Sequence, residues 1–213
     1  MPTINDIVIV ADGEFPTHEI PLNILRKAGF IISCDGAASK LISQGIVPNI
    51  ITGDMDSLDP ILQEKYSSII IKDGCQETND LTKAFMLAVK QGGQKISIVG
   101  ATGLREDHTL GNISLLYEYL LITDIPVTMW TNYGLLFAIK KGGVFKCTPG
   151  SQISVFSLDR GLRMKSKGLI YPLDDVIYDN WWKATLNESF DNSFELIFEE
   201  GRVIVFISYP KLY

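Results

Sequence analysis

The chain has 213 residues, of which 46% are hydrophobic and 21% charged, and its net charge is -6. This composition is that of an ordinary globular protein long enough to bury a sizeable core. A nucleic-acid partner is not expected, because a nucleic-acid surface needs a basic face. No membrane association is expected either, since no apolar run approaches membrane-spanning length. The first residues also lack the basic segment that opens a signal peptide.

The three cysteines, Cys34, Cys75 and Cys147, are odd in number and widely spaced. This spacing is typical neither of a disulfide framework nor of a zinc site. We therefore expect reduced thiols and a cytoplasmic location.

Strands and helices are expected to alternate over residues 1–134. Apolar runs of strand length lie at 4–10, 30–34, 50–51, 69–71, 96–99 and 127–130. Helices are expected at 21–28, from 37 to Gly45, from Pro60, from an Asn79 cap to Gly92, and from an Asp107 cap onward. Alternation of helices with continuous apolar strands is typical of a parallel sheet covered on both faces. The sequence thus predicts an α/β, Rossmann-like domain.

The pattern changes after about Leu135, where helical periodicity disappears. Short alternating segments follow at 135–139, 144–147, 153–158, 193–198 and 203–209, separated by turn residues. This pattern indicates antiparallel strands. We therefore expect a second, all-β domain over residues 135–213, built as a β-sandwich.

Glycine and polar residues follow nearly every strand of the first domain. The ends read Asp12-Gly13, Asp35-Gly36, Gly53-Asp54 and Gly100-Ala101-Thr102-Gly103. In parallel sheets ligands bind beyond the carboxyl ends of the strands. We expect these ends to converge on one rim that holds the functional site.

Asp54 and Asp56 follow the third strand. In extended geometry residues two apart point the same way, so their carboxylates would repel each other unless a cation lay between them. Mg²⁺ fits, because it prefers oxygen ligands and is usually held by one or two carboxylates plus substrate phosphates. A solvated acidic turn before a helix that starts at Asp59-Pro60 fits this stretch equally well.

Two further clusters lie on the predicted rim. Asp80 falls in a first helical turn, where the helix dipole alone favours it, and Lys83 is either a phosphate ligand or a surface lysine. The Gly-rich turn after the strand at 96–99 offers backbone N–H groups to a phosphate, and Arg105 adds a planar fork of donors. Neither the P-loop nor the dinucleotide-binding spacing is present.

Four elements follow one another along the first domain: Asp35-Gly36-Ala37-Ala38, Gly53-Asp54-Met55-Asp56-Ser57, residues 76–84, and residues 103–108 with Asn112. In their order and spacing these elements resemble those of the thiamine pyrophosphokinase family. Residues 168–173 resemble the family's Gly-Leu-x-aromatic-x-Leu element. Departures are Asn79 where the family usually has Thr, Cys75 where it often has Asp, and Leu104 in place of a second Gly.

This resemblance implies an enzyme, a thiamine diphosphokinase that transfers pyrophosphate from ATP to the hydroxyl of thiamine and releases AMP. It implies Mg²⁺ as cofactor and a homodimer, in which residues 1–134 bind ATP and Mg²⁺ and residues 135–213 bind thiamine and dimerise. The residues it assigns to the metal are Asp54, Asp56 and Asp80, which with Arg105 form the catalytic set. Those it assigns to ATP are Asp35, Gly36, Lys83, Thr102, Arg105, Asp107, His108 and Asn112. Those it assigns to thiamine are Gln76, Tyr171, Thr185 and Asn187.

Tyr171 is the expected stacking residue because it occupies the family's aromatic position. At least one of Trp181 and Trp182 is expected in the core, since neighbours on a strand point to opposite faces.

Three other functions are compatible with the Asp54/Asp56 pair. They are a Mg²⁺-dependent phosphatase, a sugar-nucleotide transferase, and a non-catalytic nucleotide- or thiamine-binding module. Phosphatases of that kind normally place the pair after the first strand, whereas here it follows the third. Neither rival enzyme would form AMP from ATP.

Overall fold

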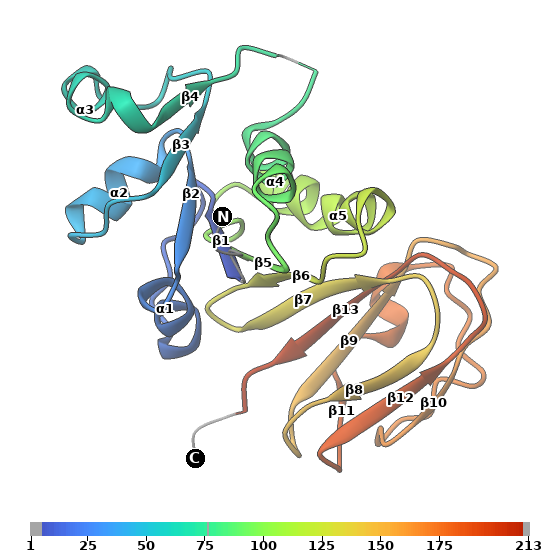
Figure 1. The fold of residues 1–213 in the computed structure, drawn as a ribbon. Helices are drawn as coiled ribbons and strands as arrows, with labels where there is room; N and C mark the ends of the chain where they lie inside the picture. Colours follow the sequence, from blue (N-terminus) through green and yellow to red (C-terminus); the bar gives the residue numbers. More distant parts are fainter. Residues whose placement is uncertain (1–5, 76, 211–213) are drawn as a thin grey trace. The chain divides into compact units, whose positions relative to one another are not determined.

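The computed structural model describes residues 6–75 and 77–210. The chain forms two compact units, Met1–Asn132 and Tyr133–Tyr213, which are coloured blue to green-yellow and yellow to red (Figure 1). Among the described residues, no helix has the length and apolar character needed to cross a membrane.

A parallel sheet forms the centre of the first unit. Its strands are Asp6–Val10 (β1), Phe30–Cys34 (β2), Ile50–Gly53 (β3), Ile70–Lys72 (β4), Lys95–Val99 (β5) and Val127–Trp130 (β6). They lie in the order β6-β5-β1-β2-β3-β4, and every neighbouring pair is parallel. The chain therefore leaves β1 toward one edge and returns beside it through β5, which creates a topological switch point between β1 and β5.

Helices cover both faces of this sheet (Figure 1). They are Glu19–Arg26 (α1), Ala37–Ser43 (α2), Pro60–Lys65 (α3), Asp80–Lys90 (α4) and Glu106–Ile122 (α5), with a 3-10 turn, Ser67–Ile69 (η1), before β4. Val8 and Val10 share a buried cluster with Leu25 of α1 and Leu41 of α2. Alternation along β1 turns Ile7 to the other face, on which α4 packs. The predicted α/β class is confirmed.

The start of α4 is fixed against α5 by two buried aromatic side chains. The rings of Phe85 and Tyr119 stack with centroids 3.8 Å apart, and both side chains are fully buried. The Tyr119 hydroxyl lies 3.1 Å from the Thr82 hydroxyl. Burial raises the pKa of Tyr119, so it stays a neutral hydrogen-bonding group. These contacts hold the N-terminal half of α4 against the C-terminal part of α5.

The second unit is an antiparallel sandwich. Its strands are Gly134–Ile139 (β7), Gly143–Lys146 (β8), Gln152–Ser157 (β9), Lys165–Lys167 (β10), Asn187–Glu188 (β11), Ser193–Ile197 (β12) and Val203–Ser208 (β13). Strands β11-β9-β13-β7 form one layer and β10-β12-β8 the other. One buried cluster takes side chains from both layers, among them Val155, Phe194 and Val205, so the predicted sandwich is confirmed.

Two local expectations were wrong. Helix α5 begins at Glu106 with Arg105 at its N-cap position, so Asp107 lies inside the first turn and is not the cap. The two tryptophans lie on a 3-10 helix, Trp181–Ala184 (η2), and not on a strand. Alternation across a sheet therefore does not apply, and 42% of Trp181 and 64% of Trp182 are exposed.

Candidate active site

A pocket of about 380 Å³ opens in the first unit at the carboxyl ends of β1, β2 and β5 and at the starts of α4 and α5. This volume is in the range of small-molecule sites, and the pocket lies at the switch point of the sheet. The expected convergence of the strand ends on one rim is confirmed. The lining residues are Ala11, Asp12, Gly13, Cys34, Asp35, Gly36, Ser57, Asn79, Asp80, Leu81, Ala101, Thr102, Leu104, Arg105, His108, Thr109 and Asn112.

The acidic stretch after β3 is a tight turn. Gly53 has a φ of 149° and Met55, whose side chain is buried, has a φ of 69°. A left-handed conformation at a residue other than glycine is uncommon and costs free energy, so it persists only where the surroundings hold it. The Asp54 Oδ1 accepts the N–H of Asp56 at 3.3 Å. The turn, and not the extended geometry that the sequence analysis assumed, brings the two aspartates together.

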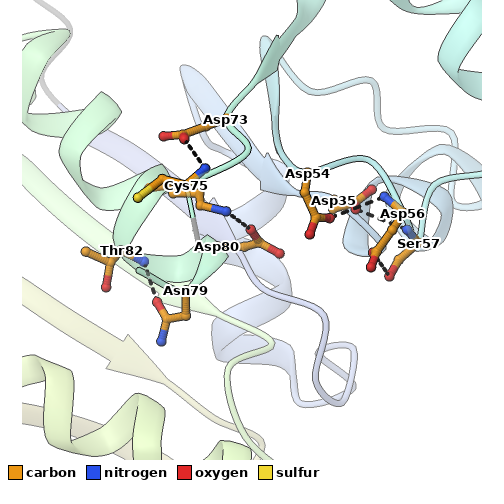
Figure 2. Close-up of polar contacts among 10 residues, drawn as sticks. Asp35, Asp54, Asp56, Ser57, Asp73, Cys75, Asn79, Asp80 and Thr82 are labelled. Atoms are coloured by element: carbon orange, nitrogen blue, oxygen red, sulfur yellow. Dashed lines mark hydrogen bonds and ion pairs between the residues drawn. The ribbon is translucent and has the colours of Figure 1, made fainter. Parts of the chain in front are cut away.

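Asp35 joins this pair because β2 and β3 are neighbours. Cys34 is in register with Thr52, which sets Asp35 beside Gly53. One oxygen from each of Asp35, Asp54 and Asp56 lies within 4.8 Å of the other two, and Figure 2 shows the three carboxylates gathered beside the turn.

The Asp35 carboxyl is only 2% exposed. Its Oδ2 accepts the N–H of Ser57 at 3.1 Å, whereas its Oδ1 is buried and has no hydrogen-bond partner in the part of the chain that the structure describes. Burial raises the pKa of Asp35; the Ser57 N–H opposes this shift, and the nearby carboxylates of Asp56, Asp80 and Asp54 add to it.

Asp80 faces this cluster from the first turn of α4 (Figure 2). Asn79 caps the helix by accepting the N–H of Thr82 at 2.8 Å. The Asp80 Cγ lies 3.4 Å from the point that a Cβ on Gly53 would occupy. Four carboxylates therefore surround a single turn.

Lys83 is neither at the surface nor among the described residues that line the pocket. Its buried Nζ lies 3.0 Å from the Asp80 Oδ1. Burial alone would lower the pKa of Lys83, but the Asp80 hydrogen bond and the surrounding carboxylates raise it above its ordinary value. The ammonium therefore stays charged and holds Asp80 in place.

The donor set fits a hard divalent cation. A buried carboxylate oxygen without a partner is costly, and three carboxylates that face one another are unfavourable unless a positive charge offsets them. Mg²⁺ and similar ions accept such all-oxygen ligands. Asp35 belongs to this set by geometry, although the sequence analysis placed it in the nucleotide pocket.

The opposite wall of the pocket comes from residues 100–112. The N–H of Gly103 donates to the Thr109 hydroxyl at 3.3 Å, so the Gly-rich turn uses internally one donor that was expected to bind phosphate. The Asn112 side chain donates to the Ala101 carbonyl at 2.8 Å. These bonds shape the loop that carries Thr102.

Arg105 and Asp107 form an exposed ion pair on this wall. The Arg105 Nε lies 3.1 Å from the Asp107 Oδ1. The hydrogen bond from Arg105 is the main cause that lowers the pKa of Asp107 to about 2. Arg105 and His108 line the pocket, whereas Asp107 is not among the described lining residues and orients Arg105.

The expected thiamine residues fall in different places. Gln76 lies outside the described residues. In the second unit the buried Asn187 side chain donates to the Tyr171 carbonyl at 2.6 Å and accepts its N–H at 3.1 Å. The Tyr171 side chain is 65% exposed, and the Thr185 hydroxyl donates to the Trp182 carbonyl at 2.8 Å. Asn187 therefore supports Tyr171.

The sequence analysis placed Asp12 on the rim without giving it a role, and it missed Lys40. Asp12 lines the pocket, and its Oδ1 lies 2.7 Å from the Lys40 Nζ. The only sequence feature that pointed to Asp12 was the Asp12-Gly13 pair at the end of the first strand. No local pattern connects this pair with Lys40, which lies 28 residues later.

Comparison with known proteins gives consistent results. The sequence pattern of "Thiamin pyrophosphokinase, catalytic domain" matches residues 22–129, and that of "Thiamin pyrophosphokinase, substrate-binding domain" matches residues 134–206. The fold is similar to the crystal structure of thiamine pyrophosphokinase from Bacillus subtilis, with a TM-score of 0.80 and 22% identity over 98% of this chain and 100% of that chain. The enzyme from Candida albicans has a TM-score of 0.81 at 16% identity, over 96% and 89% of the two chains. At these identities the likeness establishes the fold.

Curated relatives agree with this result. Thiamine pyrophosphokinase 1 of Oryza sativa subsp. japonica is 38% identical over 104 residues, which are 44% of this chain and 38% of that protein. Thiamine pyrophosphokinase of Bacillus subtilis (strain 168) is 32% identical over 124 residues, which are 55% of this chain and 56% of that protein. The chain thus covers about half or less of the length of these relatives. Because family patterns match both of its units, the chain belongs to the thiamin pyrophosphokinase family.

Proposed function

We propose that this protein is a thiamine pyrophosphokinase that transfers the pyrophosphoryl group of ATP to the hydroxyl of thiamine, giving thiamine diphosphate and AMP. The observation that carries the proposal is the match of both the catalytic and the substrate-binding pattern of this family. The carboxylate-rich pocket at the switch point supports it, since it suits a phosphorylated ligand that arrives with a divalent cation. No observation favours the phosphatase, the sugar-nucleotide transferase or the binding module.

In the proposed reaction the thiamine hydroxyl attacks the β-phosphorus in line, and AMP leaves. The bond from the hydroxyl oxygen to the β-phosphorus forms while the bond from that phosphorus to the AMP oxygen breaks. Negative charge is spread over the phosphate oxygens, so positioning and electrostatic stabilisation supply most of the rate. The chain's contribution is to hold the two substrates in line and to place its cations beside the phosphates.

We assign Asp54, Asp56 and Asp80 to Mg²⁺, with Asp35 as a fourth carboxylate of the same cluster. When bound, the ion neutralises charge on the phosphate oxygens. Lys83 orients Asp80 through the ion pair between them.

The remaining wall is assigned to the nucleotide. Asp35 and Gly36 line one side of the pocket, and Thr102, His108 and Asn112 line the opposite side. Arg105, held by Asp107, presents its guanidinium to the phosphates.

The thiamine part of the site is assigned to the second unit. Thiamine is cationic and aromatic, and an exposed aromatic ring suits it by stacking and cation–π attraction. Tyr171 offers such a ring on a backbone that Asn187 fixes, with Thr185 nearby in sequence and Gln76 contributed by the first unit. We propose that a homodimer brings Tyr171 of one subunit to the nucleotide site of the other. The free thiols of Cys34, Cys75 and Cys147 suit a cytoplasmic enzyme.

Incubation with ATP, Mg²⁺ and thiamine tests the reaction directly. One AMP is expected for each thiamine consumed, because the β- and γ-phosphates leave together. Nucleotides are separated by chromatography, and ATP without thiamine serves as the control. Formation of ADP in step with thiamine loss would refute the proposed function.

Asp54→Asn and Asp56→Asn are each expected to lower turnover on the order of a hundredfold or more, with the fold retained. Each change removes a charge from the metal cluster and barely alters shape. Steady-state rates at saturating Mg²⁺ measure the loss, and circular dichroism monitors the fold. Asp124→Asn, at an exposed position of the same unit, is the matched control. Unchanged rates in both cluster variants would contradict the metal assignment.

The raised pKa of Asp35 predicts a pH-dependent stability in the metal-free protein. The folded state keeps the Asp35 proton to higher pH than the unfolded chain, so stability falls as pH rises from about 4, the pKa in the unfolded chain. Asp35→Asn removes the ionisable group and with it this fall in stability at higher pH. Its Tm in chelator should equal that of the wild type below about pH 4 and exceed it increasingly as pH rises. Added Mg²⁺ should raise the Tm of the wild type more than that of Asp35→Asn. A Tm gap that does not vary with pH would contradict this account.

Tyr171→Ala is expected to raise the KM for thiamine about tenfold and that for ATP much less. If the site is shared, mixing Tyr171→Ala with Asp54→Asn chains should restore activity, because one site of each heterodimer then carries neither defect. Statistical mixing would give about a quarter of the wild-type rate. Verified subunit exchange without recovered activity would show that each site is built from a single chain.

A further inference from the structure

The loop that follows β1, residues 11–14, forms one part of the pocket wall and is bonded to a second part. The N–H groups of Gly13 and Glu14 donate to the carbonyls of Gly100 and Thr102 at 2.6 and 2.8 Å. This approach requires glycine, because a Cβ on Gly13 would lie 2.5 Å from the Gly100 oxygen. The loop after β1 therefore moves together with the wall that carries Ala101 and Thr102.

Lys40 of α2 connects the same loop to the other side of the pocket. Its Nζ pairs with the Asp12 Oδ1 at 2.7 Å and also donates to the carbonyls of Asp12 and Gly13, at 3.3 and 2.9 Å. An ammonium has three N–H donors, and these contacts give each of them an acceptor. The Asp12 carboxylate lies directly over Gly36, where a Cβ would clash with its Oδ2. These contacts hold the loop after β1 against the part of the pocket wall formed by Asp35 and Gly36.

The ion pair between Lys40 and Asp12 also changes the charge that the pocket presents to a ligand. Asp12 lines a pocket that already contains Asp35 and Asp80, and the proposed ligand carries phosphates. Without its partner, the Asp12 carboxylate would repel them. Because the side chains of Lys40 and Asp12 are 38% and 47% exposed, an ion pair between them contributes little to global stability. Its loss should therefore alter the pocket more than the fold.

We infer that Asp12 and Lys40 are positioning residues of the nucleotide site: the Lys40 ammonium fixes the loop after β1 between the two pocket walls and neutralises Asp12. The inference rests on the proposed function for the identity of the ligand. Its structural part, the clamping of the loop, does not.

The test compares Lys40→Met with Lys40→Arg and with Lys90→Met, which removes the same charge from the last turn of α4. Kinetics give the KM for ATP and kcat, calorimetry gives the affinity for ATP with Mg²⁺, and NMR gives the amide exchange rates of Gly13 and Glu14. Asp12→Asn is a second variant that leaves the Lys40 contacts to the two carbonyls possible.

Lys40→Met is expected to raise the KM and the dissociation constant for ATP about fivefold, to change kcat less, and to speed exchange of both amides. Lys40→Arg should restore most of the affinity, and Lys90→Met should match the wild type. Asp12→Asn should fall between the wild type and Lys40→Met.

Unchanged amide exchange in Lys40→Met would overturn the clamp whatever the enzyme does. Unchanged ATP affinity in Lys40→Met, with a wild type that binds ATP, would overturn the positioning role while leaving the proposed function intact. A wild-type protein that binds no ATP would instead refute the proposed function, and with it the role assigned to these residues in nucleotide binding.

Discussion

Repulsion between carboxylates that the backbone forces together governs the site of this protein. Asp35 is carried to the turn after β3 by the register of β2 and β3, and the turn itself folds Asp54 and Asp56 toward it. The buried Oδ1 of Asp35 has no partner within the described chain. Such an arrangement is costly unless a cation relieves it. This geometry supports the proposal that the site binds a divalent ion and, through that ion, a phosphorylated ligand.

The absence of side chains at a few glycines makes this crowding possible. A Cβ on Gly53 would lie 2.7 Å from the Asp35 Cβ, and one on Gly100 would lie 2.6 Å from the Ala11 carbonyl oxygen. Together with Gly13 and Gly36, these residues let neighbouring loops approach to backbone contact. Glycine after the strands thus serves close packing of the rim as well as turn formation. Two lysines offset part of the negative charge at this rim. Lys83 pairs with Asp80, and Lys40 pairs with Asp12.

The two units contribute different kinds of contact to the proposed reaction. The first supplies charge and hydrogen-bond donors on rigid strand ends and helix starts, which suits phosphates. The second supplies an exposed aromatic ring, Tyr171, whose backbone is held by the buried Asn187 amide. Because the backbone at Tyr171 is already held, only the side chain would have to be ordered when the ring stacks on a cationic ligand. The family patterns agree with these two roles, since a catalytic-domain pattern matches the first unit and a substrate-binding pattern matches the second.

The sequence by itself determined the order and kind of most elements, because periodicity and capping are local, but it did not predict the short strands β10 and β11 or the 3-10 helix η2. Phe30–Cys34 (β2) was predicted with its observed bounds, and the Asn79 cap placed the start of α4 correctly. Tertiary structure alone decided which distant side chains meet. Strand order put Asp35 beside Asp54, helix packing buried Lys83, and the contact between α2 and the loop after β1 paired Lys40 with Asp12. The contacts of Asp35 with Asp54 and of Lys40 with Asp12 join residues far apart in the chain, and local patterns do not say which individual side chains will meet.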